Sequence, residues 1–394
     1  MQNQKKRPRG LKINAGMTLV ELLIALVLGV TLAAGVTQIY VGSSTTERSQ
    51  EARLRMQEGG RFGINFLSQE IRMAGYFGCL SSIAGTSANS MLVPELTLPA
   101  HFQPEWGIQG WEADGTLPGE TSNSTLNVAQ VATSTSEWDT GDDNIVMPVF
   151  DAVPNSDIVR VWGGTGAAGK VIAFFLGPDG MPAITVEANG GIGANDFLLI
   201  SDCVRVDIAQ ACSVTQPTPT SSQIFLGESA DDCLPGNLLG PFTSNTESDA
   251  PAEVIRLQGT IFYVGKRGGL AGNPPALFRA QLDAEGNLAT AEELIEGVES
   301  MQILYGVNSN EDSRRTADAY LTADVVTQWQ NVVSVRITLL MQSIDDGIVP
   351  QPQGYSFNGV VYDGGDTGGS LPADRRVRRI FTTTISLRNR ALGV

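Results

Sequence analysis

The sequence has few of the residues that catalytic centres and nucleic-acid-binding surfaces depend on. Its 394 residues include one histidine, four cysteines, and 26 lysines and arginines against 42 aspartates and glutamates. A single histidine narrows the choice of acid–base and metal sites. The formal net charge of −16 argues against a protein that binds nucleic acid or anionic lipid, because neutralising phosphates requires clustered lysine and arginine.

The sequence also lacks a repeat of fixed period, and only 17% of its residues are charged while 42% are hydrophobic. These values exclude an acidic disordered tail, a coiled coil and a collagen-like repeat. A chain of this length can bury a full hydrophobic core and is long enough for two subdomains. The four cysteines can therefore assist the fold without having to replace its core.

One long apolar segment lies near the N-terminus. Residues 17–36 read MTLVELLIALVLGVTLAAGV, with Glu21 as their one charged residue. At about 1.5 Å per residue, a helix of this length reaches roughly 30 Å and can cross a bilayer. Residues 1–16 contain five basic and no acidic residues, which is typical of a cytoplasmic flank. A secretory signal peptide is the alternative, because Ala33-Ala34-Gly35 imitates its cleavage site.

Glu21 needs an explanation, because an ionised carboxylate in a membrane-spanning helix costs about 3 kcal/mol or more unless it is paired. One interpretation is a charge near the end of the span that reaches toward the lipid headgroups. The other is that cleavage between Gly16 and Met17 creates an α-amine four residues before Glu21. The amine of a neighbouring, staggered helix would then neutralise the carboxylate inside the lipid.

A basic leader that ends in Gly16, followed by Met17-Thr18-Leu19-Val20-Glu21 and an apolar helix, resembles the type IV prepilin (class III) signal. The resemblance implies cleavage after Gly16 by a membrane prepilin peptidase and N-methylation of Met17. It also implies that Glu21 is the carboxylate used in filament assembly. The family usually has phenylalanine at the first mature position, so Met17 is a departure that keeps a bulky apolar side chain there.

Helical periodicity continues beyond the membrane segment, and residues 37–78 contain no proline. Apolar residues recur on one helix face at Ile64, Leu67, Ile71 and Ala74. Phe62 and Phe66 form an i,i+4 pair beside this face. The pattern predicts one helix from residue 17 to about Gly75, whose second half packs on a globular head. Gly59 and Gly60 are expected to weaken this helix.

After Cys79 the pattern becomes that of a β-rich head. Residues 81–142 are interpreted as long loops with short elements, 213–223 as a surface loop, and 322–330 as a short helix with Val325, Val326 and Trp329 toward a sheet. Alternating apolar residues predict strands at 145–150, 157–162, 170–175, 183–187, 197–201, 204–208, 254–264, 277–282, 301–307, 332–341 and 378–387.

The sequence thus predicts an α+β fold, in which a long N-terminal helix packs on a large antiparallel β-rich head. Its four parts are a leader (1–16), the helix (17–78) with its transmembrane segment (17–36), a loop-rich and β-rich variable region (79–290) and a C-terminal β region (291–394). Because the head is expected on the oxidising side of the membrane and no C-x-x-C spacing is present, disulfides are favoured over metal ligation. The four cysteines allow three pairings, of which we prefer Cys79–Cys203 with Cys212–Cys233.

Four segments resemble the PilW-type minor pilins of type IV pili. They are MAGYFGC (73–79), GVESMQILYGV (297–307), VVSVRITLL (332–340) and RRIFTTTISLRN (378–389). The resemblance covers residues 12–80 and about 290–394. It implies an inner-membrane precursor with a periplasmic head that joins other minor pilins, the major pilin and a large tip adhesin in the cell-surface pilus. The alternatives are a J-type pseudopilin of type II secretion and a pilin-borne adhesin or DNA-binding module.

Several motifs of chemical interest fail on their context. Residues 164–169 match G-x-G-x-x-G, but the β-branched and aromatic run that follows favours a glycine-rich connection between strands over a phosphate site. Asn308, Asn310 and Asp312 alternate like calcium ligands, but the central glycine and the final glutamate are missing. His101 has no recognisable triad around it. We therefore expect no enzyme activity, no cofactor and no metal.

Two groups of residues leave the choice between structure and binding open. Arg375, Arg376, Arg378 and Arg379 form the one basic cluster outside the leader, either as a docking patch for an acidic partner or as the polar rim of a terminal strand. Tryptophans 106, 111 and 138 lie in the loop-rich region and are either buried or anchors for a partner.

Overall fold

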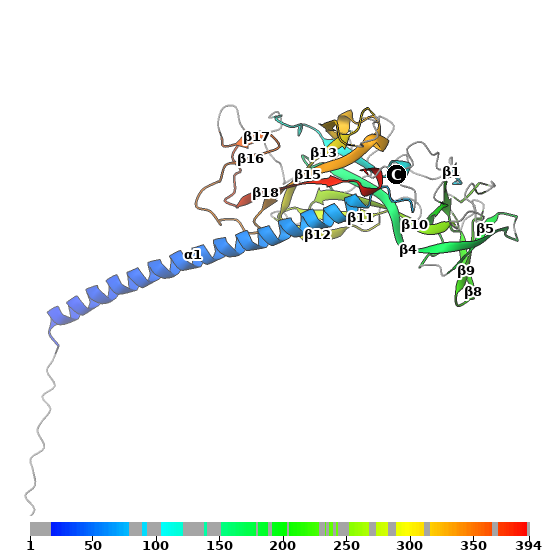
Figure 1. The fold of residues 1–394 in the computed structure, drawn as a ribbon. Helices are drawn as coiled ribbons and strands as arrows, with labels where there is room; N and C mark the ends of the chain where they lie inside the picture. Colours follow the sequence, from blue (N-terminus) through cyan, green and yellow to red (C-terminus); the bar gives the residue numbers. More distant parts are fainter. Residues whose placement is uncertain are drawn as a thin grey trace, which may run out of the picture. The chain divides into compact units, whose positions relative to one another are not determined.

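The computed structural model describes residues 17–78, 89–92, 104–120, 138–139, 151–178, 180–187, 191–202, 205–227, 233, 236–238, 242, 252–267, 273–282, 289–310, 316–364 and 369–391. The chain divides into two compact units, residues 1–51 and 52–394. One long helix and an antiparallel β-rich head make up the described chain (Figure 1). The expected α+β, pilin-like fold is therefore confirmed.

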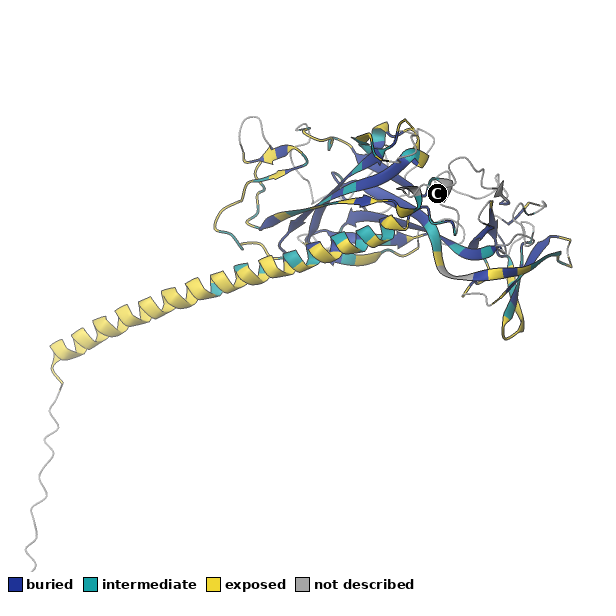
Figure 2. Cartoon of the chain, viewed as in Figure 1, coloured by how far each residue is buried: buried dark blue, intermediate teal, exposed yellow. Residues whose placement is uncertain are grey.

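The helix α1 (Leu19–Arg72) runs for 54 residues without a break. In the first unit its side chains are almost all exposed (Figure 2). It is the one helix of the described residues that is long and apolar enough to cross a membrane. The helix ends just before a turn in which Gly75 takes a φ of +70°, a left-handed conformation that glycine adopts readily at a helix C-terminus.

Within the described residues, the larger sheet has twelve strands. Eight follow the order β1-β7-β6-β10-β4-β5-β9-β8; in addition, β11 pairs with β10 and β12 with β11, while β2 pairs with β4 and β3 with β2. Apart from the parallel pair β1 and β7, its strands pair antiparallel. The strands are β1 (Asn89–Ser90), β2 (Ile108–Ala113), β3 (Trp138–Asp139), β4 (Ile158–Leu176), β5 (Pro182–Glu187), β6 (Phe197–Ser201), β7 (Val206–Gln210), β8 (Ser213–Thr218), β9 (Ser221–Phe225), β10 (Glu253–Gly265), β11 (Ala276–Gln281) and β12 (Glu292–Glu296).

The smaller sheet is antiparallel, with the order β14 (Ala319–Leu321), β13 (Val298–Val307), β15 (Val332–Gln342) and β18 (Arg378–Ser386). A separate hairpin joins β16 (Tyr355–Phe357) to β17 (Val360–Tyr362). Three short 3-10 turns, η1 (Pro104–Trp106), η3 (Ala323–Val325) and η4 (Trp329–Asn331), and the terminal helix α2 (Arg388–Ala391) complete the described elements.

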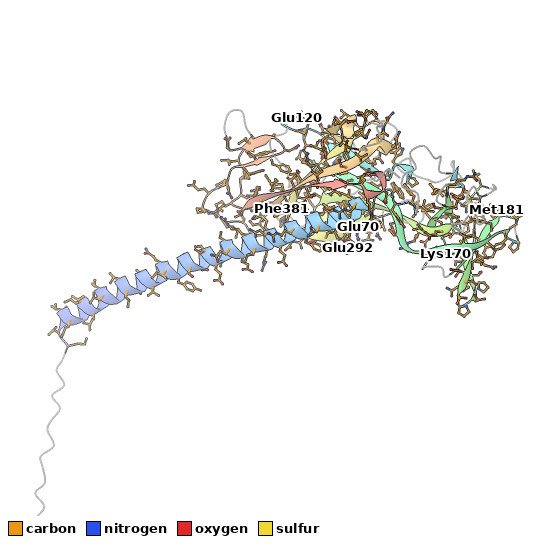
Figure 3. The ribbon with its side chains drawn as sticks, in the orientation of Figure 1. Glu70, Glu120, Lys170, Met181, Glu292 and Phe381 are labelled. Atoms are coloured by element: carbon orange, nitrogen blue, oxygen red, sulfur yellow. A yellow bond between two sulfur atoms is a disulfide. The ribbon has the colours of Figure 1, made fainter. Side chains whose placement is uncertain are left out.

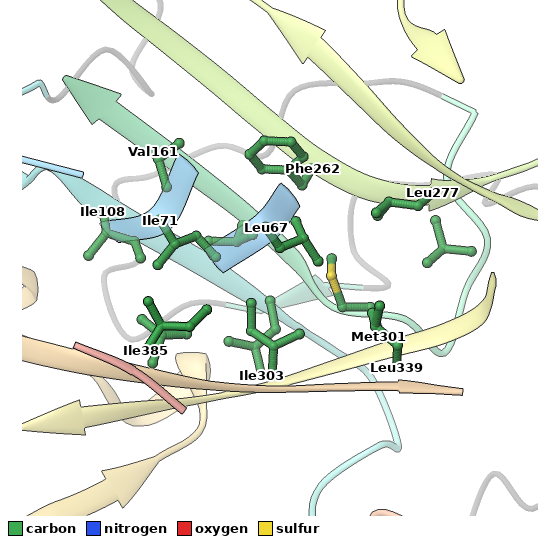
Figure 4. Packing of buried hydrophobic residues seen from close by; sticks show 14 of the residues in the cluster. Leu67, Ile71, Ile108, Val161, Phe262, Leu277, Met301, Ile303, Leu339 and Ile385 are labelled. Atoms are coloured by element: carbon green, nitrogen blue, oxygen red, sulfur yellow. The ribbon is translucent and has the colours of Figure 1, made fainter. Parts of the chain in front are cut away.

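The second half of α1 supplies the centre of the main core. Leu67 and Ile71 have no exposed surface. Figure 4 shows both between Phe262 of the larger sheet and Ile303 of the smaller one. The expected apolar face is confirmed, because Ala74 is buried as well and Ile64 packs against the same cluster. The head is thus two sheets held together by the helix segment between them.

Of the two expected weak points of α1, Gly60 is a site of close packing and Gly59 is not, while Gly63 is a further close approach. An added Cβ at Gly60 would overlap the ring of Phe381 on β18, and one at Gly63 would lie 2.6 Å from Ile295 Cδ1 on β12. Phe381 lies next to α1 in Figure 3. Helix stability is lower at glycine, but the missing side chains let the helix backbone approach both sheets.

The glycine-rich motif lies inside a strand, so the expected connection between strands is wrong. β4 runs through it for 19 residues, and predicted strands 157–162 and 170–175 are parts of this one strand. The turn after α1 hydrogen-bonds directly to β4: Gly75 N–H donates to the Trp162 carbonyl oxygen (2.7 Å), and Gly164 N–H to that of Tyr76 (2.8 Å). An added Cβ at Gly163 would lie 3.0 Å from the Met73 carbonyl oxygen.

Two other expectations about the head are corrected. Residues 213–223 are not a surface loop, because β8 and β9 form a hairpin there. Residues 322–330 are two 3-10 turns, not a helix; Val326 and Trp329 are buried but Val325 is 51% exposed. The short elements expected within 81–142 include β2, but neither its place nor the full burial of its residues was evident from the sequence. The predicted strand 145–150 lies outside the described residues.

Candidate assembly site

The first turn of α1 places Glu21 against its own helix start. Glu21 N–H donates to Thr18 Oγ1 (3.2 Å), while the Thr18 N–H and hydroxyl both donate to Glu21 Oε2 (3.2 Å each). This reciprocal arrangement is a capping box, which satisfies main-chain donors that the helix leaves without partners. Met17 is 70% exposed directly before it, and Gly16 lies outside the described residues.

The membrane segment satisfies its own polar groups. The Thr31 hydroxyl donates to the Val27 carbonyl oxygen (3.0 Å), and the Thr37 hydroxyl to that of Ala33 (2.8 Å). Such bonds within the helix suit hydrocarbon, where no water is present to accept them. Glu21 is then the one ionisable side chain of residues 17–36. An approaching ammonium group would meet a carboxylate already positioned by Thr18.

The structure contains the Cys212–Cys233 disulfide, with a Cα–Cα distance of 5.1 Å. It closes a loop with a sequence separation of 21 residues. Polar groups surround it: Asn237 Nδ2 donates to the carbonyl oxygens of Gln210 (2.8 Å) and Gly227 (3.2 Å). The other expected pair, Cys79 and Cys203, lies outside the described residues.

A buried carboxylate that the sequence analysis missed joins the two sheets. Asp157 is 1% exposed, and its two oxygens accept from the N–H groups of Ala113 on β2 (3.0 Å) and Ile303 on β13 (2.7 Å). Its own N–H donates to the Met301 carbonyl oxygen (2.8 Å). These bonds engage main-chain groups of β13 at Met301 and Ile303, where β14 does not pair with β13. A single aspartate before a strand gives no sequence signal for this role.

Glu112 lies in the same buried environment, 4% exposed. Burial raises the pKa of Glu112, and the neighbouring Asp157 and Asp324 carboxylates raise it further. Burial also raises the pKa of Asp157, although its two main-chain donors oppose this. Because both Asp157 oxygens accept from N–H groups, we assign the ionised form to Asp157 and the proton to Glu112.

The basic cluster is in large part structural. Arg378 makes two-pronged contacts with Glu299 (2.7 and 3.0 Å) and with Asp374 (2.7 and 2.9 Å). Arg376 donates to the carbonyl oxygens of Ser343 (2.6 Å) and Ile344. Burial raises the pKa of Glu299 more than Arg378 lowers it, whereas the pKa of Asp374 is lowered by Arg378 in spite of partial burial. The other two arginines of the cluster, 375 and 379, are exposed.

Of the candidate calcium ligands, the described Asn310 hydrogen-bonds to a carboxylate of the protein itself. Asp318 accepts from the N–H groups of Ser309 (2.8 Å) and Asn310 (3.3 Å), which lowers its pKa. Asp312 and His101 lie outside the described residues. No group of three or more histidine, cysteine or acidic side chains suited to a metal is found in the described part of the chain.

The tryptophans of the loop-rich region belong mainly to the core. Trp111 is 1% and Trp138 6% exposed. The guanidinium of Arg160 lies 5.3 Å from the ring centroid of Trp111, within the range of a cation–π contact. Trp106 is partly buried and packs against the same clusters. The alternative that these side chains are anchors for a partner is thus not needed to explain Trp111 and Trp138.

Fold and helix together define a membrane-anchored protein with a globular head, built on an α+β, pilin-like plan. The family model of the type IV pilus-assembly protein W (PilW) matches residues 261–389. This range begins in β10 and includes the whole smaller sheet. The match supports the interpretation of the chain as a PilW-type type IV pilus protein that takes part in pilus assembly. No curated protein and no solved structure matches the chain.

Proposed function

We propose that the protein is a minor pilin that helps to start the type IV pilus, in a tip or priming complex with other minor pilins. Its role is assembly, with no catalytic step, cofactor or metal. The observation that carries the proposal is the signal of residues 12–21 in front of an exposed apolar helix, on a chain whose C-terminal region matches a pilus-assembly family.

In this proposal the leader holds the precursor in the inner membrane with its head in the periplasm. Prepilin peptidase cleaves after Gly16, and Met17 is N-methylated. The new amine of one subunit then pairs with Glu21 of a displaced neighbour, because both charges are costly in lipid unless they meet. The Thr18 contacts hold the Glu21 carboxylate in place before this pairing. The head then contacts other minor pilins, the major pilin and a large tip adhesin.

Two substitutions separate processing from assembly. With Gly16→Val we expect a full-length, unprocessed precursor on a gel. With Glu21→Val we expect normal processing but loss of co-purification with the other pilus subunits, because the partner's amine then has no counter-charge. Glu21→Asp is the matched control, since it keeps the charge on a shorter side chain. Normal processing of Gly16→Val, or unchanged piliation with Glu21→Val, would contradict the proposal.

The strongest alternative is a J-type pseudopilin of type II secretion, because its signal and its large β-rich head are of the same kind. The match to a pilus-assembly family favours the pilus. A deletion strain tests the choice directly: we expect loss of surface pili with protein secretion intact. Loss of secretion with normal piliation would favour the pseudopilin. A pilin-borne adhesin or DNA-binding module would instead leave piliation intact and abolish surface binding.

A further inference from the structure

The strand β18 lies at one edge of the smaller sheet. Within the described residues it pairs with β15 alone. It is nine residues long, and residues 380–386 contain no charge, proline or glycine. Proteins usually shorten or protect such edges, because their main-chain groups readily pair with another chain. A long, unprotected edge strand on an assembly protein is therefore a candidate surface for pairing with another chain.

Hydrogen bonds at both ends of β18 show which main-chain groups face outward. Leu387 N–H donates to the Val333 carbonyl oxygen (2.9 Å), and Ser343 N–H donates to that of Val377 (2.9 Å). The register between these ends has no bulge. Because bonded pairs alternate along an antiparallel ladder, the odd-numbered residues of β18 bond to β15. The even-numbered residues, including Thr382, direct their N–H and C=O groups away from it.

The helix covers a face of β18 and not this outer edge. Ile385 lies in the main core, and Phe381 packs against Gly60 of α1; both are odd-numbered. The even-numbered Thr382 and Thr384 lie on the opposite face and are exposed. No described residue hydrogen-bonds to the outward main-chain groups of residues 380–386. An incoming strand can therefore add to the sheet without displacing the helix.

Positive charge lies along this edge of an otherwise acidic protein. Without the leader, 21 basic residues remain against 42 acidic ones. The exposed Arg379 lies at the start of β18, with the exposed Arg375 just before the strand, and the Arg379 guanidinium is 5.5 Å from the centroid of the Phe381 ring. Toward the other end, Arg336 Nε donates to Thr384 Oγ1 (3.4 Å). Charge complementarity then favours an acidic strand in this position.

We propose that the outer edge of β18 receives an extended, acidic segment of another pilus subunit as an additional strand of the smaller sheet. Main-chain hydrogen bonds to the even-numbered residues supply the affinity, and the exposed arginines select the acidic segment. This inference rests on the proposed function for the identity of the partner. It adds a contact in the head to the pairing expected at Glu21.

The test uses the full chain in cells that carry its pilus system. Tagged protein is purified in mild detergent, and the major pilin and each other minor pilin are measured with specific antibodies. Thr382→Pro removes one outward N–H, which an edge strand tolerates, and should lower recovery of one subunit about tenfold. The matched control Thr382→Val keeps the N–H and should recover the wild-type amount. Arg379→Glu should lower the same recovery, and Arg379→Lys should not.

The outcomes separate this inference from the proposed function. If the wild-type chain recovers no pilus subunit, the proposed function fails. If it recovers subunits and Thr382→Pro recovers as much as Thr382→Val, edge pairing is overturned while the proposed function stands. If the one partner lost is a second, differently tagged copy of this chain, the acidic partner is overturned in favour of self-pairing.

Amide hydrogen exchange keeps the inference testable should Thr382→Pro fail to fold. In the purified wild-type complex, the amides of residues 380, 382, 384 and 386 should exchange at least about tenfold more slowly than in the free chain, because they become hydrogen-bonded. Equal exchange of these amides in the free chain and in the complex would overturn edge pairing.

Discussion

At the residue scale, Glu112 and Asp157 place two carboxyl groups where the two sheets meet. We call this contact, which Asp157 makes with β2 and β13, the joint. Asp157 is fully engaged by N–H donors from both sheets. The Glu112 side chain accepts a long hydrogen bond from the Thr116 hydroxyl (3.4 Å). Buried acids are costly when ionised, and this cost is reduced when Glu112 keeps its proton and Asp157 alone is ionised. The stability of the contact between the two sheets should therefore depend on pH.

We expect the protein to lose stability as pH rises above the ordinary glutamate range. The folded state holds the Glu112 proton more tightly than the unfolded chain, since the pKa is raised from the model-peptide value of 4.5. Stability from this group is complete below that value and is lost as pH rises toward the folded-state pKa. Urea unfolding in detergent should show a loss of about 1–3 kcal/mol between pH 5 and 8.

Glu112→Gln should remove most of this pH dependence, because glutamine is neutral at every pH. Glu187→Gln, at an exposed position of β5, is the control and should leave the slope as in the wild type. A slope that is the same in Glu112→Gln and in the wild type would show that the joint does not hold the proton.

Arg378 shows a different solution to the same problem of buried charge. It neutralises Glu299 on β13 while holding Asp374 with its remaining donors, and its side chain is 2% exposed. Removing one partner of such a group leaves the other charge buried and uncompensated. A sequence gives the four arginines as a cluster, but it does not give their burial, so structural and exposed arginines become distinguishable only in the fold.

At the element scale, α1 shows how far periodicity predicts and where it stops. The apolar face of Leu67 and Ile71 was evident from the sequence, because side chains recur at helical spacing. The close approach at Gly60 and Gly63 was not, because the residues they meet, Phe381 and Ile295, come from strands more than two hundred positions away. Local pattern gives an element and its inward face but not its distance from a partner.

The strands follow the same rule. Most predicted strands of the head are present, since alternation of apolar residues reports a half-buried surface. Two predicted strands are parts of β4, because the glycine-rich residues 164–169 were interpreted as a connection between strands. In the structure, Gly163 and Gly164 leave room for the turn that follows α1. A tertiary contact thus decides what the local sequence leaves ambiguous.

Alanine substitutions at the neighbouring Gly59 and Gly60 distinguish the effect of helix propensity on stability from the effect of packing. An added Cβ at Gly59 would lie 3.4 Å from Ile295 Cγ2, an ordinary contact, whereas at Gly60 it would overlap the Phe381 ring. We expect Gly59→Ala to stabilise the head by about 0.5–1 kcal/mol and Gly60→Ala to destabilise it by about 1–2 kcal/mol. Urea unfolding of both variants measures the difference, and equal effects of the same sign would contradict close packing at Gly60.

At the scale of the whole molecule, the same helix belongs to two units. Its first part, up to Glu51, lies in a unit of exposed apolar side chains, and its second part, from Ala52, lies in the unit of the head. One continuous helix therefore provides both a membrane anchor and a piece of the core. The chain cannot be divided at the end of the helix without removing part of the core.

This division predicts different outcomes for two truncations. A chain that begins at Ala52 keeps Leu67 and Ile71, whereas one that begins at Gly75 loses both, along with Met56 and Ala74 from the main core. Each fully buried leucine or isoleucine contributes about 1.5–3 kcal/mol, and a domain is stable by only about 5–15 kcal/mol in total. The longer chain should fold and be monomeric without detergent, and the shorter one should aggregate.

Circular dichroism and size-exclusion chromatography measure both outcomes, and the Cys212–Cys233 disulfide gives an independent check. In the chain from Ala52 this disulfide should resist mild reductant to the same extent as in the full-length protein, because its surroundings at Gln210, Gly227 and Asn237 are unchanged. If the chain from Gly75 folds as stably as the chain from Ala52, α1 does not form part of the core of the head. The two sheets would then have to pack directly on each other, which their inward apolar faces at Phe262 and Ile303 would permit only by closing the space that Leu67 and Ile71 occupy.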